Sequence, residues 1–250
     1  MKNSPLNVCR ICKSRKLEKY LDLGKHPFSN SFLTRNQVKG EKKFSLAVVL
    51  CKKCGLSQLS IIPNTKFIFS EYDYLSSSSS ALSNHYKNLV KKLINQYKIK
   101  SFENILDIGC NDGILLKHFP KRFKKLIGFE PSDASKYIKD RRIKLFRNFF
   151  GDATSKRYLK KFNKPKLITI TNVLAQIPNL EDFVRGLKNL LNENNLIVIE
   201  FPYLLDMIKS SIFDVIYHEH LSYFSLTPLD YLFKKNGIQM INYEKLTFGA

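Results

Sequence analysis

The sequence predicts an α/β fold built on a mostly parallel sheet, with a small N-terminal module that carries paired cysteines. From residue 104 onward, short apolar runs alternate with helical patterns, which is how a parallel sheet covered by helices is encoded. The runs 167–170 and 196–199 are almost entirely apolar, as strands buried on both faces require. Four of the five cysteines fall within the first 60 residues, so the cysteine module precedes the α/β domain.

Each element of this fold can be assigned to a range of the sequence. We expect the sheet strands at 104–109, 125–130, 143–147, 167–173, 195–201 and 238–243. We expect the helices between them at 113–119, 132–140, 153–162, 180–191 and 227–235. A helix over 81–97 has one apolar face, and a strand over 46–50 leads into the second cysteine pair. The chain therefore divides into a cysteine module over 1–66, a connecting segment over 67–98 and an α/β domain over 99–250.

The composition limits the classes of partner. The 250 residues, 44% of them hydrophobic, can bury the core of one ordinary domain and a small module. The net charge is +21, yet 33 of the 42 basic residues are lysines, spread along the whole chain. Nucleic-acid-binding proteins favour clustered arginines, so we interpret this charge as a solvated surface. Because no apolar run reaches about 18 residues and residues 1–5 contain no hydrophobic signal region, we expect a cytoplasmic protein that does not cross a membrane.

The cysteines form two C-x-x-C pairs, Cys9 with Cys12 and Cys51 with Cys54. Such a pair directs both thiolates toward one ion, and two pairs complete a tetrahedral zinc site. A redox motif would not explain two copies. A site closed by four thiolates is structural rather than catalytic, and a module this small needs the metal to fold.

A glycine turn follows the expected strand 104–109, in the spacing D-x-G-x-x-x-G from Asp107 to Gly113. A strand, a glycine turn and a helix N-terminus form a nucleotide-binding corner, although the spacing differs from the G-x-G-x-x-G of dinucleotide enzymes. Glu130 ends the next strand, where an acid commonly binds ribose hydroxyls. Ligands of parallel sheets lie beyond the carboxyl ends of the strands, where four polar residues are expected: Asp107, Glu130, Asn172 and Glu200.

Several motifs together resemble one enzyme family, the S-adenosylmethionine-dependent sugar C-methyltransferases of deoxysugar biosynthesis. The resemblance covers essentially the whole chain and rests on the segments CRIC, CKKCGLSQL, DIGCNDG, GFEPS, TNVLAQIPN, IEFPY and YHEHLSYF. It implies a class I methyltransferase fold with an N-terminal zinc-binding domain. It also implies S-adenosylmethionine as methyl donor and a nucleotide-linked 4-keto-deoxysugar as acceptor, methylated at the carbon beside the ketone.

The resemblance also implies roles for individual donor-site residues. Gly109, Asn111 and Gly113 would shape the donor loop, with Asp107 at its base. Glu130 would accept hydrogen bonds from the ribose hydroxyls. Two residues after the fourth strand of the domain would border the methionine end and the adenine: Asn172 and Leu174.

The base that removes the acceptor proton is expected in the YHEH segment. His220 would be the base, Glu219 would tune or orient it, and Tyr217 would contact the sugar or the enolate. Histidine has a pKa suited to proton transfer near pH 7. From the segment 72–74, which contains two tyrosines, we expect Tyr74 rather than Tyr72 to reach the acceptor.

Other interpretations of the same residues remain open. His218 and His220 could belong to a metal site, although no third ligand at a known spacing supports this. Adjacent residues do not face one another on a helix, so pairing of Glu219 with His220 requires a turn. Aromatic residues such as Tyr72 and Tyr74 often serve only in packing.

The sequence departs from the family pattern in two places. Relatives commonly have histidine where this chain has Gln176, which can hydrogen-bond but cannot exchange protons. Relatives also continue past residue 250 with a further strand and a C-terminal domain, so we expect a fragment or one part of a split protein. The alternatives to a sugar C-methyltransferase are therefore a methyltransferase for another small acceptor and an inactive remnant that acts as a binding module.

Overall fold

The computed structural model describes residues 4–29, 33–62 and 74–246. The chain forms two compact units, each assembled from separated stretches. The cysteine unit comprises Met1–Glu71, Leu174–Glu181 and Phe201–Ala250. The parallel-sheet unit comprises Tyr72–Val173 and Asp182–Glu200. None of the helices in the described ranges is long and apolar enough to cross a membrane.

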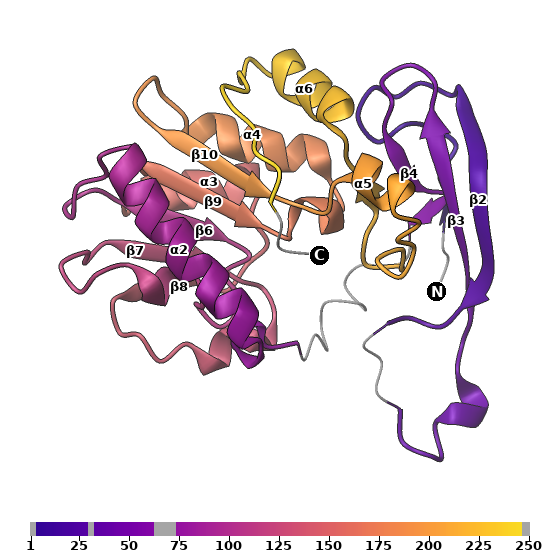
Figure 1. Cartoon of the computed structure of the whole chain (residues 1–250), viewed down its shortest axis with the longest axis horizontal. Coiled ribbons are helices and arrows are strands. Elements are labelled where there is room, and N and C mark those ends of the chain that lie inside the picture. Colours follow the sequence, from indigo (N-terminus) through magenta and orange to yellow (C-terminus); the bar gives the residue numbers. More distant parts are fainter. Residues whose placement is uncertain (1–3, 30–32, 63–73, 247–250) are drawn as a thin grey trace. The chain divides into compact units, whose positions relative to one another are not determined.

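The parallel-sheet unit contains a five-stranded sheet in the order β10-β9-β6-β7-β8, in which every pair is parallel (Figure 1). The strands are β6 Ile105–Ile108, β7 Leu126–Phe129, β8 Ile143–Phe146, β9 Leu167–Thr171 and β10 Leu196–Glu200. These five confirm the strands expected between residues 104 and 201. Because β6 is the central strand, the glycine turn that follows it lies at the middle of the carboxyl edge of the sheet.

Helix α2, Ser80–Gln96, confirms the helix expected at 81–97. Ser79 begins it, because its side-chain oxygen accepts a hydrogen bond from the N–H of Leu82 at 3.2 Å. Its apolar face packs on the sheet in one core cluster that contains Leu82, Tyr86, Val90, Leu93, Ile105 and Leu126. Burial of such large side chains, at about 25 cal/mol per Å² of apolar surface, stabilises this unit.

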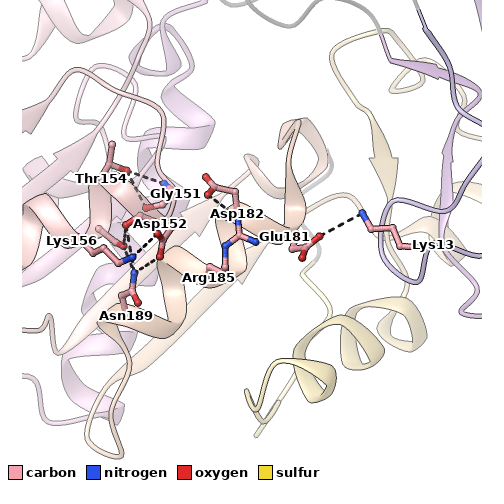
Figure 2. Close-up of polar contacts among 10 residues, drawn as sticks. Lys13, Gly151, Asp152, Thr154, Lys156, Glu181, Asp182, Arg185 and Asn189 are labelled. Carbon is pink, nitrogen blue, oxygen red and sulfur yellow. Dashed lines mark hydrogen bonds and ion pairs between the residues drawn. The ribbon is translucent and has the colours of Figure 1, made fainter.

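Helices α3, Asp152–Leu159, and α4, Leu180–Leu190, confirm two more expected elements. Figure 2 shows how they meet: the side-chain amide of Asn189 on α4 donates to Asp152 Oδ1 and to Ser155 Oγ on α3, both at 2.9 Å. Gly186 permits this approach, since a Cβ there would lie 2.7 Å from the backbone of Gly151. Two partly buried polar contacts therefore fix the two helices to each other.

Two expected helices are wrong. The ranges 113–119 and 132–140 form only 3-10 turns, η3 Leu116–His118 and η4 Asp133–Tyr137. Pro120 disfavours helical backbone at the residue before it, which limits the first segment. Both segments are also shorter than the length at which a helix becomes stable on its own.

The cysteine unit is built on an antiparallel sheet in the order β11-β4-β3-β2. Its strands are β2 Leu17–His26, β3 Phe44–Cys51, β4 Ser57–Leu59 and β11 Ser222–Tyr223, and a second small sheet pairs β1 Ser4–Pro5 with β5 Ile61–Ile62. Strand β3 confirms the strand expected at 46–50. Strand β11 comes from more than 160 residues further along the chain than β4, so the unit is not a contiguous module.

The remaining elements of the cysteine unit are η1 Val38–Gly40, η5 Leu174–Gln176, α5 Leu204–Lys209 and α6 Leu226–Lys235. Helix α6 confirms the helix expected at 227–235, whereas α5 is not anticipated by the sequence. The strand expected at 238–243 is wrong: this segment is irregular, and Ile241 and Tyr243 are 68% and 69% exposed. A strand needs a partner to be stable, and this segment pairs with none of the described residues.

Candidate functional site

Four cysteine sulfurs in the cysteine unit lie within 4.8 Å of one another. The Sγ atoms of Cys9 and Cys54 are 3.5 Å apart, and those of Cys12 and Cys51 are also 3.5 Å apart. A tetrahedral zinc ion with sulfur ligands at about 2.3 Å needs sulfurs separated by roughly 3.8 Å. The four cysteines therefore fit a zinc site of the closed, structural kind.

The surroundings of Cys9 favour its thiolate form. The hydrogen bond from the Cys54 thiol lowers the pKa of Cys9, backbone N–H groups lower it further, and burial opposes this. The N–H groups of Ile11 and Cys12 lie 3.4 and 3.5 Å from its sulfur. Because the thiolate is the form that binds metal, Cys9 is prepared as a ligand.

His218 and His220 belong to no group of metal-binding side chains among the described residues, where the four cysteines form such a group. His218 is fully buried against Phe28, at 5.2 Å between ring centroids, and its Nε2 lies 3.2 Å from the carbonyl oxygen of Ser45. Burial lowers its pKa. His218 is therefore a packing residue of the antiparallel sheet.

The turn after β6 has the backbone of a ligand cradle. Gly109 and Gly113 have φ angles of 76° and 79°, and Asn111 between them has a φ of 49°. A Cβ on Gly109 would lie 2.3 Å from Cγ2 of Val173, so this position accepts only glycine. The turn brings bare backbone to the carboxyl edge of the sheet, where a nucleoside can approach closely.

The side chains of this turn hold the segment that contains Tyr74. Asn111 Oδ1 accepts the N–H of Ser76 at 2.9 Å, and Asn111 Nδ2 donates to the carbonyl oxygen of Tyr74 at 2.9 Å. Asp112 Oδ2 accepts the N–H of Ser77 at 3.1 Å. The backbone of Tyr74 is therefore tied to the turn, while its side chain is 43% exposed. The other tyrosine of this segment, Tyr72, lies outside the described residues.

Glu130 faces the same turn and is only 7% exposed. Its Oε2 accepts the N–H of Asn111 at 2.9 Å, and its Oε1 accepts the N–H of Ser132 at 2.8 Å. A carboxylate has about four acceptor positions, so further ones remain for the two hydroxyls of a ribose. The turn and this carboxylate together fit S-adenosylmethionine.

Asp107 is buried beneath the turn, at 2% exposure. Burial raises its pKa to about 7, although the hydroxyl of Thr169, which donates to its Oδ1 at 2.7 Å, acts in the opposite direction. The negative charge of Glu130 raises the pKa further. Asp107 therefore lies in β6 just before the turn and holds a proton over part of the neutral range, and its role at the donor loop stays a prediction.

A further polar group lies at the ends of β9 and β10, where it joins the expected residues Asn172 and Glu200 to His85, which no sequence pattern singles out. His85 Nε2 on α2 is 2.8 Å from Glu200 Oε2, and both side chains are 14% exposed. The carbonyl oxygen of Glu200 accepts the N–H of Asn172 at 2.8 Å, and Asn172 has a strained φ of 57°. His85 and Glu200 are separated by 115 positions, so no local pattern in the sequence predicts their pairing.

In the cysteine unit the structure brings His220 and Tyr217 together. The Oη of Tyr217 lies 2.8 Å from His220 Nε2, and the carbonyl oxygen of Val215 lies 2.9 Å from His220 Nδ1. Because a carbonyl can only accept, Nδ1 carries the proton and the Nε2 lone pair accepts the Tyr217 hydroxyl. The pair is therefore arranged so that a proton can move from Tyr217 to Nε2.

His220 is neutral at pH 7, because burial lowers its pKa to about 4. Both of its ring nitrogens are bonded by Val215 and Tyr217, which set the orientation of the ring. Glu219 is 2% exposed, and the orienting role expected for it stays a prediction.

Two expected site residues lie in η5 of the cysteine unit rather than in the parallel-sheet unit. Leu174 is fully buried, and its contact with adenine stays a prediction. Gln176 is partly exposed at the end of η5, and its effect on the acceptor also stays a prediction.

Two family models and a curated relative match this chain. A model described as "Methyltransferase domain" matches residues 63–243, and one described as "Putative zinc binding domain" matches residues 9–69. The C-methyltransferase NovU of Streptomyces niveus is 26% identical over 240 residues, which are 95% of this chain and 57% of NovU. The chain thus spans little more than half the length of that relative.

Solved structures of methyltransferases resemble parts of the chain. A SAM-dependent methyltransferase from Archaeoglobus fulgidus is 19% identical with a TM-score of 0.47, covering 60% of this chain and 68% of its own. The plantazolicin methyltransferase BamL, in complex with a triazolic desmethylPZN analog and SAH, is 16% identical with a TM-score of 0.46, covering 69% of this chain and 66% of its own. The methyltransferase-domain model, which matches well over half of the chain, decides the assignment, and the protein belongs to the family of S-adenosylmethionine-dependent methyltransferases that carry an N-terminal zinc-binding domain.

Proposed function

We propose that the protein is a C-methyltransferase whose acceptor is the carbon beside the ketone of a nucleotide-linked 4-keto-deoxysugar. The observation that carries this proposal is the hydrogen-bonded pair of Tyr217, which is partly exposed, and His220, which is buried, in a chain similar to the C-methyltransferase NovU. Oxygen and nitrogen acceptors already have a lone pair. A carbon acceptor must first lose a proton, so a dedicated base supports methyl transfer to carbon.

The ketone makes the neighbouring C–H bond acidic, and Tyr217 and His220 would together remove its proton. As that bond breaks, its proton passes to the Tyr217 oxygen while the Tyr217 proton moves to His220 Nε2. The electron pair of the bond becomes the C=C bond of the enolate, whose oxygen takes the negative charge. The carbonyl of Val215 accepts from Nδ1–H throughout, so it stabilises the imidazolium that forms.

The parallel-sheet unit would hold the donor. Gly109, Asn111 and Gly113 would shape the cradle, and Glu130 would bind the ribose. S-adenosylmethionine, when bound there, supplies an electrophilic methyl group. Asn111 also ties the Tyr74 backbone to the cradle, so occupation of the cradle and placement of Tyr74 for the acceptor are linked. The net charge of +21 attracts an anionic nucleotide-linked sugar.

Exchange of the acceptor C–H with deuterated water, without methyl donor, tests the proposal directly. A set of nucleotide-linked 4-keto-sugars would be incubated with the intact protein and with the His220→Asn and Tyr217→Phe variants. Asparagine can still donate to the carbonyl of Val215, so His220→Asn keeps that hydrogen bond but removes the base. We expect exchange and methyl transfer to fall by roughly 10²–10⁴-fold, the usual contribution of a positioned base, while donor affinity is kept.

His85→Asn is the matched control, because His85 is a partly buried histidine of the parallel-sheet unit that is held by an acidic partner, Glu200. Exchange that persists in His220→Asn but vanishes in His85→Asn would assign the base to the parallel-sheet unit. If the intact protein exchanges no 4-keto-sugar, the acceptor is of another class.

A further inference from the structure

Arg10 stands between the two cysteines of the first C-x-x-C pair, and its guanidinium is directed into the cysteine unit, at 7% exposure. Its Nη1 donates to Ser222 Oγ, and its Nη2 donates to the carbonyl oxygens of Ile177 and Pro178, the latter at 2.9 Å. The planar fork of an arginine suits several acceptors at fixed angles. The side chain of Arg10 thus joins two segments that are far apart in the sequence, one at 177–178 and the other at Ser222.

Both segments are connected to the proposed base, His220. Ser222 follows His220 by two residues, and the intervening Leu221 donates its N–H to the carbonyl oxygen of Ala175 at 2.8 Å. The carbonyl of Leu221 accepts the N–H of Leu59 at 3.2 Å. Arg10 therefore closes a network that joins the base segment to η5 and to β4.

The backbone of Arg10 strengthens the same network. Its N–H donates to Gln58 Oε1 at 2.9 Å, and Gln58 Nε2 donates to the carbonyl oxygen of Val8 at 3.2 Å. Gln58 lies opposite Ser222 in the pairing of β4 with β11. The loop that carries Cys9 and Cys12 is thus bonded to β4 through Gln58 and to β11 through Ser222.

The charge of Arg10 points to the metal. Among the described residues, no carboxylate lies within ion-pair distance of its guanidinium, and its side-chain acceptors are a hydroxyl and two carbonyls. A buried cation is costly unless an anion lies nearby. Four thiolates around one divalent zinc ion leave two net negative charges next to Arg10. The negative charge of Cys9 acts favourably on the Arg10 guanidinium, so the cysteine site supplies the counter-charge that no carboxylate of the described residues supplies.

We propose that Arg10 is a positioning residue, which transmits zinc occupancy to the segment 217–222 and so holds His220 in its working orientation. The inference rests on the proposed function only in the role of His220. The structural link itself concerns Arg10, the zinc site and the segments 174–178 and 217–222, and can be measured without any substrate.

Hydrogen–deuterium exchange on the full chain measures this link. Peptides covering 174–179 and 217–224 would be followed in the zinc-loaded protein, in the zinc-stripped protein and in the zinc-loaded Arg10→Gln and Arg10→Lys variants. We expect Arg10→Gln to keep its zinc and to speed exchange in both peptides by roughly ten- to hundredfold, because buried hydrogen bonds to a charged group are lost. Stripping zinc should remove the protection of both peptides together with that of the rest of the cysteine unit. Arg10→Lys, which keeps the charge, should have a smaller effect than Arg10→Gln.

Arg15→Gln is the matched control, since Arg15 lies in the same loop but is exposed, and it should leave both peptides unchanged. A peptide over 105–109 reports on the parallel-sheet unit and should not change in any sample. Unchanged protection in both Arg10 variants would overturn the proposal. So would equal loss of protection in Arg10→Gln and Arg15→Gln.

Kinetics separate this proposal from the proposed function. If 4-keto-sugars are substrates, Arg10→Gln should lower kcat for deuterium exchange at least tenfold, with the donor Kd unchanged and with partial rescue in Arg10→Lys. A wild-type protein that acts on none of these sugars contradicts the proposed function. The exchange-protection results decide the role of Arg10 in either case.

Discussion

The two units achieve stability by different means. The parallel-sheet unit has a core of large apolar side chains, among them Leu106, Ile127 and Phe129, all between 0 and 1% exposed. The cysteine unit buries an apolar cluster together with three of its four cysteines, the guanidinium of Arg10 and the imidazole of His218. Apolar burial favours folding without any ligand. The cysteine unit instead contains thiol groups that would be held together by a bound metal ion. The two units should therefore respond differently to removal of the metal.

The buried titratable groups of the two units also differ in the sign of their pKa shifts. Burial raises the pKa of Asp107 in the parallel-sheet unit to about 7 and lowers the pKa of His220 in the cysteine unit to about 4. In both cases a low-dielectric site disfavours the charged form. For His220, the folded state is most stable above the ordinary pKa of 6.5, and this stability is lost as the pH falls from 6.5 toward 4. For Asp107, stability is instead lost as the pH rises toward 7. The stability of the two units should therefore change with pH in opposite directions.

Removing the metal should produce the largest difference between the units. Structural zinc sites contribute about 10–16 kcal/mol of apparent binding free energy, so a chelator or Cys51→Ser should unfold the cysteine unit. The parallel-sheet unit should keep its exchange protection and its donor binding. Metal analysis of the purified protein should find about one equivalent of zinc.

Cys110→Ser is the matched control for the metal experiment, because Cys110 is buried in the parallel-sheet unit and takes no part in the cysteine cluster. It should leave the zinc content unchanged. If the Cys51→Ser variant keeps both its zinc and the hydrogen-exchange protection of β3, the expected dependence of the cysteine unit on zinc is contradicted.

The same contrast explains what the sequence could predict. Strands β6 to β10 follow from contiguous apolar runs, and the roles of Gly109 and Glu130 follow from their positions next to those runs. The pairing of β11 with β4 and the bonds of Arg10 to Ile177 and Ser222 join residues that are more than 160 positions apart. No local periodicity records such contacts. The cysteine unit is assembled from three stretches, and local patterns indicate only the first of them, the module expected over 1–66.

The site shows the same division. The glycine turn was predicted because its residues are consecutive, but its connection to the Tyr74 segment depends on side-chain bonds from Asn111 and Asp112 over more than 30 positions. The pair of His85 and Glu200 was missed for the same reason. Side-chain partners across a fold follow from packing geometry, which a local pattern does not contain.

The next largest effect is expected for the pH dependence of unfolding, through the buried carboxyl group of Asp107. Its pKa rises from an ordinary 3.8 to about 7 in the folded protein, so between these values the folded state binds a proton that the unfolded state has lost. The free energy of unfolding should therefore fall as the pH rises through this window, by on the order of 4 kcal/mol. Asp107→Asn keeps an oxygen for the Thr169 hydroxyl and should remove this dependence.

The measurement is urea unfolding of both proteins at pH 5 and pH 8, with protection of β6 as the probe. The difference between wild type and Asp107→Asn cancels the contribution of His220, whose slope has the opposite sign. His220→Asn supplies the complementary comparison, since it should flatten the loss of stability below pH 6.5. Equal pH slopes in wild type and Asp107→Asn would contradict the buried, protonated state of Asp107.

Glu130 should produce the smallest effect, confined to donor binding in the parallel-sheet unit. Glu130→Ala removes the acceptor of the Asn111 and Ser132 N–H groups and the expected partner of the ribose hydroxyls. We expect S-adenosylmethionine binding to weaken by about 1.5–3 kcal/mol, the range for hydrogen bonds to a charged group. Zinc content should not change, because the four cysteines belong to the other unit.

Calorimetry with two ligands sharpens this last test. S-adenosylhomocysteine has the same ribose as S-adenosylmethionine but lacks its positive charge, so a ribose contact predicts an equal loss for both ligands. A loss for the charged donor alone would mean that Glu130 acts through its charge at a distance. Asp133→Ala is the control, since Asp133 is an exposed acid three residues further on that pairs with Lys136, and its removal should cost less than about 0.5 kcal/mol. Equal affinities in wild type and Glu130→Ala would remove Glu130 from the donor site and leave the cradle to the backbone of the glycine turn.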